Sequence, residues 1–137
     1  MSDLNIFDVA GRAMSAQQVR LNAVASNLAN AQSISSSPDT AYSAMRPVFQ
    51  TEYAAFQQNT GVATVSAVDV QRSQAPAEKR YSPGHPLADK DGYIYSSNVD
   101  TNEEMVEMME AARQYQNNIE VIATAKSLML KTLSVGK

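Results

Sequence analysis

The chain has 137 residues, of which 44% are hydrophobic and 18% charged, and its formal net charge at pH 7 is −3. This length suits one ordinary domain, and the slightly acidic balance provides no basic surface for nucleic acid. Because there is no cysteine, disulfides and thiolate metal sites are excluded. The first residues have neither a cationic start nor a continuous apolar core, so we expect no cleaved signal peptide. No stretch approaches the roughly 18 apolar residues that span a bilayer.

A long amphipathic helix is predicted near the N-terminus, over residues 4–30. One row of apolar residues recurs every seven positions at Phe7, Met14, Leu21 and Leu28, and a companion row begins at Leu4. Two such rows are typical of a helix that packs along a partner helix.

The polar face of this helix carries amides where a solvated helix would carry charges. Between residues 21 and 45 the only charged residue is Asp39. Amides can be buried between helices, because they form hydrogen bonds without the desolvation penalty of a charge. We therefore expect the amides of both ends of the chain to contact neighbouring subunits. These residues are Asn22, Asn27, Asn30, Gln116, Asn117 and Asn118.

The middle of the chain, residues 34–99, is predicted to be a β-rich and loop-rich insert. The segment "GVATVSAVDVQR", residues 61–72, is rich in β-branched residues and predicts a strand. A short strand is expected at residues 93–95, after a turn at Asp91 and Gly92. Residues 46–59 fit either a short helix or an extended segment.

The single histidine lies in the segment "SPGHPLAD". A general base or a metal ligand would need a companion group, and no second His or Cys is present. Prolines restrict the backbone on both sides of the histidine, so we interpret the segment as a structural loop whose leucine packs against this domain or a neighbouring subunit. The loop residues are Pro83, Gly84, His85, Pro86 and Leu87.

A second long helix is predicted over residues 102–135. Thr101 and Glu104 have the spacing of a capping box, and glutamates at the start with lysines towards the end match the helix dipole. Two rows of apolar residues follow a heptad spacing and are expected to pack against other helices. The row expected to pack against the first helix contains Met108, Tyr115, Ile122 and Met129. The companion row of helix-packing residues contains Met105, Ile119 and Leu133.

Together these elements predict an α+β fold. Residues 1–33 and 100–137 would form an antiparallel, coiled-coil-like domain for assembly, which the resemblance described below implies is the inner domain, and residues 34–99 a central domain of strands and loops. We expect no catalytic site, metal or cofactor. A structural subunit surrounded by copies fits the pattern best; a helical coiled-coil adaptor and a subunit of another secretion-system filament are the alternatives.

The segment "RLNAVASNLANA" resembles the N-terminal signature of flagellar axial proteins, which include rod, hook and hook-associated proteins. Residues 83–137, which begin "PGHPLADKDGYIYSSNVDTNEEMVEMMEAARQYQ", resemble more narrowly the C-type proximal rod proteins of the flagellar basal body. Together with the length of the chain, the resemblance covers most of the sequence.

The resemblance implies a structural subunit of the proximal rod, the periplasmic drive shaft that transmits torque and encloses the export channel. Such a subunit leaves the cytoplasm through the flagellar type III export apparatus without a cleaved signal peptide. Its partners would be copies of itself, other rod proteins and the base of the rod at the export gate and MS ring. No direct insertion into the membrane is implied.

Overall fold

The computed structural model describes residues 3–53 and 63–136, with the side chains of α1 described from Ile6 onward. Two long helices, α1 (Asp3–Asn30) and α2 (Thr101–Val135), enclose the remaining elements in the sequence. Between them lie β1 (Ile34–Ser35), the 3-10 helix η1 (Pro38–Thr40), β2 (Met45–Tyr53), β3 (Ala63–Arg72), β4 (Glu78–Tyr81) and β5 (Tyr93–Ser96). The predicted α+β class is confirmed.

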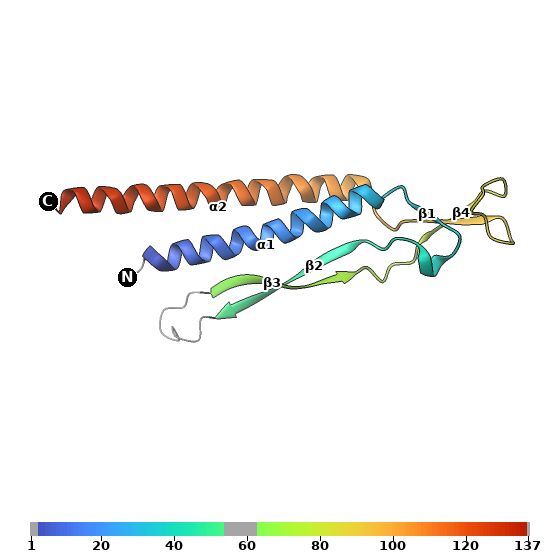
Figure 1. Ribbon diagram of the computed structural model, residues 1–137, viewed down its shortest axis with the longest axis horizontal. Helices are drawn as coiled ribbons and strands as arrows, with labels where there is room; N and C mark the ends of the chain where they lie inside the picture. The colour runs from blue at the N-terminus through green and yellow to red at the C-terminus, as the bar shows by residue number, and fades with distance from the viewer. Residues whose placement is uncertain (1–2, 54–62, 137) are drawn as a thin grey trace.

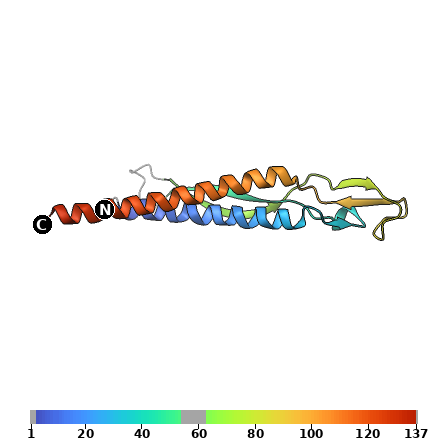
Figure 2. The same ribbon diagram turned by 90° about the horizontal axis from the view of Figure 1, so that it is seen from above.

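The helices α1 and α2 lie side by side and run in opposite directions, so that both ends of the chain lie at one end of an elongated molecule (Figures 1 and 2). With 28 residues in α1 and 35 in α2, their lengths are about 42 and about 52 Å. The C-terminal end of α2 extends past the beginning of α1 (Figure 1). The predicted antiparallel pair of terminal helices is therefore confirmed.

The hairpin of β2 and β3 lies along α1, on the side away from α2 (Figure 1). Its antiparallel register extends from Met45 opposite Arg72 to Tyr53 opposite Ala63, with an irregularity between Val48 and Phe49. The strand predicted at residues 61–72 is present from residue 63, and the undecided segment that begins at residue 46 is extended as far as residue 53. The remaining parts of both segments lie outside the described residues. Because the hairpin covers α1, this helix has neighbours on two sides.

A second, smaller sheet lies at the end of the molecule opposite the chain termini (Figure 1). Its strand order is β1-β5-β4, with β5 antiparallel to both neighbours. Ile94 in the central strand is fully buried. The strand predicted at residues 93–95 is confirmed and is one residue longer.

The beginning of α2 differs from the predicted capping box. Asp100 is the N-cap, and its carboxylate accepts hydrogen bonds from the backbone N–H groups of Asn102 (2.8 Å) and Glu103 (3.3 Å). Thr101 is already inside the helix. An ionised carboxylate is a stronger acceptor than a hydroxyl at a helix N-terminus, and Glu104 is engaged elsewhere, as described below.

The hydrophobic core contains mostly small side chains. Among the described residues, the buried hydrophobic residues are Ala10, Ala16, Ala23, Val24, Ala41, Ala44, Ile94 and Ala111. Alanine at the contact lets two helices approach closely, but it removes little apolar surface from water. Large apolar side chains meanwhile remain exposed, and most of them lie on α2. The fold of a single chain therefore leaves much of its hydrophobic surface unburied.

Candidate assembly interface

A polar cluster surrounds Asn27, which is fully buried near the C-terminal end of α1. Its amide nitrogen donates to the backbone carbonyl of Met45 (2.9 Å) and to Oε2 of Glu104 (3.0 Å). Its amide oxygen accepts from the backbone N–H of Met45 (2.7 Å) and from the hydroxyl of Tyr42 (3.0 Å). Asn27 thus binds both backbone groups of the first residue of β2 and also holds α2. A carboxylate could not make the two donor contacts.

Glu104 is the charged member of this cluster, and its side chain is fully buried. Nη1 of Arg46 lies 2.6 Å from Oε1 of Glu104, and Nη2 of the same guanidinium lies 3.3 Å from Oε1 of Glu103. A buried carboxylate is tolerated only when a cation and hydrogen-bond donors compensate its lost hydration. Arg46 supplies the charge and Asn27 the hydrogen bond, so one cluster joins α1, α2 and β2.

A second amide extends these connections to the loops beside the cluster. Asn98 accepts from the backbone N–H of Ala44 (2.8 Å) and donates to the backbone carbonyl of Ala75 (2.7 Å). The sequence analysis missed the roles of Arg46, Glu104 and Asn98. For Glu104 the sequence did contain a signal of burial. Glu104, Ala111 and Asn118 are seven residues apart and so occupy the same heptad position.

The amides predicted at subunit contacts occupy three kinds of environment. For Asn27 the prediction was wrong, because all of its hydrogen-bonding groups are used inside the chain. Asn30 is half-buried and donates to the carbonyl of Ser26 in its own helix (2.8 Å). Asn118 is half-buried, whereas Asn22, Gln116 and Asn117 are exposed. For the exposed amides, contact with a neighbouring subunit remains a prediction.

On α1, the predicted row of Phe7, Met14, Leu21 and Leu28 is half-buried throughout. The backbone of Leu4 belongs to α1, but its side chain lies outside the described residues. Because α1 contacts both α2 and the β2–β3 hairpin, its burial extends over more than one heptad row.

On α2, one predicted row is half-buried and the other is not. Met108, Tyr115, Ile122 and Met129 are half-buried. The companion positions on the same side are Glu104, Ala111, Asn118 and Ala125, and each of these is buried or half-buried. The side of α2 that faces α1 therefore combines one row of large residues with one row of small or polar residues, which permits a close approach of the helices.

Met105, Ile119 and Leu133 are 54%, 45% and 67% exposed in the single chain, so packing of these residues against a helix of another subunit remains a prediction. They lie one position along the helix from the buried companion row, which rotates them by about 100° to the outer side. With Met109 and Leu130, which are also exposed, they form what we call the outer stripe of α2. Its members follow a heptad spacing, although no element of the described chain covers them.

The loop between β4 and β5 is organised by Asp89. Oδ1 of Asp89 accepts from the backbone N–H groups of Tyr93 (2.8 Å) and Asp91 (2.9 Å), and Oδ2 accepts from the hydroxyl of Tyr95 (3.1 Å). The hydrogen bond from the Tyr93 backbone is the main cause that lowers the pKa of Asp89. Desolvation, and then the hydrogen bond to Asp89, raise the pKa of Tyr95.

The other residues of this loop contact near neighbours in the sequence. Nδ1 of His85 accepts from the backbone N–H of Leu87 (3.1 Å), which fits a structural role for the histidine. Leu87 is 44% exposed, so the expectation that it packs inside its own domain was wrong. Packing on a neighbouring subunit remains a prediction. Pro83, Gly84 and Pro86 are exposed on the same loop.

Residues 3–53 and 63–136 were compared with two other kinds of site, a metal site and a membrane-spanning helix. These residues contain no group of three or more metal-ligating side chains. Within the same ranges, no helix has the length and hydrophobicity that crossing a membrane requires. The surfaces that stand out are the exposed faces of α2, which can bind another protein through apolar contacts.

Comparisons with known proteins point to one family. The model described as "Flagella basal body rod protein" matches residues 7–32, and the model described as "Flagellar basal body rod FlgEFG protein C-terminal" matches residues 90–135. The flagellar basal-body rod protein FlgC of Salmonella typhimurium is 50% identical over 137 residues, which cover 100% of both chains. FlgC of Escherichia coli O6:H1 is 50% identical over 139 residues, and FlgC of Yersinia enterocolitica is 47% identical over 137 residues, again over 100% of each chain. The two family models fall on α1 and on the end of the chain that contains α2.

Proposed function

The chain belongs to the FlgC family of flagellar basal-body rod proteins, and from this premise we propose that its two terminal helices build the wall of the proximal rod. The protein is a structural subunit of the rod and assembles with other rod proteins in the basal body. In the proposed arrangement, residues 1–33 and 100–137 form the inner assembly domain, and residues 34–99 lie outside it.

The observation that carries this proposal is the exposed apolar surface of α2. Its large exposed members are Met105, Val106, Met109, Ile119, Val121, Leu128, Leu130, Leu133 and Val135. Monomeric proteins rarely leave so many large apolar side chains of one helix in water, and burying them against neighbours would stabilise an assembly. The predominance of alanine among the buried hydrophobic residues adds to the argument, because it leaves the single chain with a small core.

We also propose a location, an export route and neighbours for the subunit. We place the subunit in the periplasmic part of the rod, delivered by the flagellar type III export apparatus without a cleaved signal peptide. Its neighbours there would be copies of itself and other rod proteins, with the base of the rod near the export gate and the MS ring. In this role the chain transmits torque and has no enzymatic activity.

A cryo-EM map of the basal body purified from the source bacterium tests this proposal. We expect density for this chain in the proximal rod, with α1 and α2 in the tube wall next to the export channel. Density for α1 and α2 away from the tube wall, or a complete rod in cells that lack the chain, would contradict it. Limited proteolysis of the purified chain adds a second test: a rod subunit should lose both ends and retain the middle, whereas a coiled-coil adaptor should keep its helices.

A further inference from the structure

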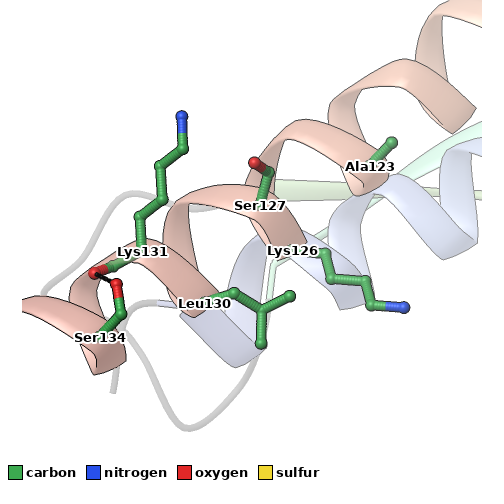
Figure 3. A pocket seen from close by; sticks show the side chains of 6 residues that line it. All are labelled: Ala123, Lys126, Ser127, Leu130, Lys131 and Ser134. Atoms are coloured by element: carbon green, nitrogen blue, oxygen red, sulfur yellow. Dashed lines mark hydrogen bonds between the residues drawn. The ribbon is translucent and has the colours of Figure 1, made fainter.

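The two ends of the molecule differ in how closely the chain covers itself. Near the C-terminus, a shallow groove is lined, among the described residues, by residues of α2 alone (Figure 3): Ala123, Lys126, Ser127, Leu130, Lys131 and Ser134. At the other end lies the sheet of β1, β5 and β4, which we call the distal sheet (Figure 1). Its strands contact one another far more than they contact α1, α2 or the β2–β3 hairpin.

The distal sheet is joined to the rest of the chain by the segments that run between them. The order of the elements requires four such segments, which follow α1, precede β2, follow β3 and precede α2. We call them together the junction. They comprise residues 31–33, 41–44, 73–77 and 97–100.

The buried residues of the junction are small. They are Ala41, Ala44 and Ser97, which are 8%, 2% and 4% exposed. Burying such side chains removes little apolar surface from water, whereas the buried backbone groups beside them must be paired by hydrogen bonds. Hydrogen bonds are therefore the main contacts that can fix the distal sheet relative to the helices.

Backbone hydrogen bonds join the four segments into two pairs. The N–H of Ser97 donates to the carbonyl of Ser33 (3.2 Å), which joins the segment before α2 to the segment after α1. The N–H of Ser73 donates to the carbonyl of Ala44 (2.7 Å), which joins the segment after β3 to the segment before β2. Neither of these bonds connects one pair with the other.

The side chain of Asn98 connects the two pairs. Its Oδ1 accepts from the backbone N–H of Ala44 (2.8 Å), and its Nδ2 donates to the backbone carbonyl of Ala75 (2.7 Å). An amide offers an acceptor and a donor on one short side chain, whereas a carboxylate offers acceptors alone. Because Ala44 is buried, its N–H cannot exchange Asn98 for water unless the junction opens.

We propose that Asn98 is the positioning residue that holds the distal sheet in one orientation relative to α1 and α2. Without its side chain, water would have to enter between the two pairs of segments to replace the lost partner of Ala44. The junction would then act as a hinge, and the exposed Tyr81 and Leu87 of the distal end would lose their fixed distance from the helices. This inference concerns the single chain and holds whether or not α1 and α2 lie in the rod wall.

The absence of cysteine allows two spin labels to be placed at chosen positions of the full-length chain. One label pair spans the junction, with Gln50→Cys on β2 and Gly84→Cys in the loop between β4 and β5. Both positions are exposed, and a Cβ at Gly84 meets nothing within 4 Å. A second pair lies on one side of the junction, with Gln50→Cys and Ser15→Cys, an exposed position on α1. Pulsed electron paramagnetic resonance then gives the distance distribution of each pair in the purified chain.

Asn98→Ala should widen the distribution of the junction-spanning pair at least twofold and leave the second pair unchanged. Asn98→Asp keeps the acceptor for Ala44 but cannot donate to Ala75 when it is ionised, so it should give an intermediate width. This milder variant decides the question if Asn98→Ala does not fold. The matched control is Gln74→Ala, an exposed amide in the same segment as Ala75, which should change neither pair.

An unchanged width of the junction-spanning pair in a folded Asn98 variant would overturn the proposal. Equal widening of both pairs would do the same, because it would show general unfolding rather than a hinge. An effect of Gln74→Ala as large as that of Asn98→Ala would also contradict it. The proposed function is tested separately by the position of the chain in the basal body, so that either can fail without the other.

Discussion

The side chains of Asn27 and Glu104, which are 77 residues apart in the sequence, meet with 3.0 Å between Nδ2 and Oε2 and are both fully buried. Arg46 on β2 balances the charge of this pair. The contact joins the two terminal helices at the end where the chain enters and leaves the middle segment. It also places β2 beside α1, because Asn27 binds both backbone groups of Met45.

Replacing Asn27 with Asp should prevent incorporation of the chain into rods while leaving export intact. The substitution removes two donor contacts and places a second carboxylate beside Glu104, a change that costs about 2–4 kcal/mol. The measurement is motility in soft agar, with immunoblots of culture supernatant for export and of purified basal bodies for incorporation.

A matched pair of variants separates this intrachain role from a general effect of charge. Combining Asn27→Asp with Glu104→Gln returns one amide and one carboxylate to the cluster, and we expect partial recovery of motility. Asn117→Asp introduces the same charge at an exposed position of α2, where it tests contact with a neighbouring subunit. Normal motility of Asn27→Asp would show that the buried cluster does not hold the helices together in the rod.

In the isolated monomer, α1 and α2 should be only weakly protected from amide hydrogen exchange, and assembly should protect them. The reason is the small core, in which most buried hydrophobic residues are alanines, so that ordering long helices gains little from burial. Exchange followed by mass spectrometry on verified monomer and on assembled rods checks this. Strong protection of residues 4–28 in monomer would contradict the prediction.

Substituting Gly92 with Ala should destabilise the loop between β4 and β5. The φ angle of Gly92 is 82°, and a Cβ there would lie 2.9 Å from a ring carbon of Tyr81 and 3.1 Å from Cβ of Pro83. Strain of this kind costs about 1–3 kcal/mol. Gly84 is the control, because a Cβ at that position meets nothing within 4 Å. Thermal unfolding followed by tyrosine circular dichroism should show a lower midpoint for Gly92→Ala and an unchanged one for Gly84→Ala.

The same loop should loosen in acid because of Asp89. Its pKa is lowered in the folded chain, mainly by the hydrogen bond from the Tyr93 backbone. The stability that the carboxylate contributes is therefore fully present above its unfolded pKa of about 3.9 and is lost as the pH falls through the lower folded value. Amide NMR shifts of Tyr93 and Asp91 should move in that range, and Asp89→Asn should abolish the movement. Shifts that move only near neutral pH would contradict this assignment.

His85→Gln should be tolerated, because Nδ1 of His85 makes one local contact, with the backbone of Leu87. Leu87→Asp should leave the stability of the single chain within about 0.5 kcal/mol, since Leu87 is exposed. A loss of motility in Leu87→Asp without a change in the unfolding midpoint would place Leu87 at a subunit contact. A bound metal at His85 would contradict the structural role of the loop.

The sequence by itself determined the elements whose cause is local. Heptad spacing specified two long helices and, on each, a row that is half-buried in the structure, from Phe7 to Leu28 and from Met108 to Met129. Period-2 patterns and turn residues specified β3 and β5, because propensity and turn chemistry act over a few residues.

Only the tertiary structure decided which neighbouring row of α2 faces α1, because adjacent rows differ by a single position. Apolar content favoured the row of Met105 and Ile119, whereas the structure buries Glu104 and Ala111. That choice depends on Arg46, which lies on another element and compensates the buried carboxylate. The burial of Asn27 inside the chain also depends on tertiary packing. The backbone groups of Met45 that it binds come beside it only after β2 has packed along α1.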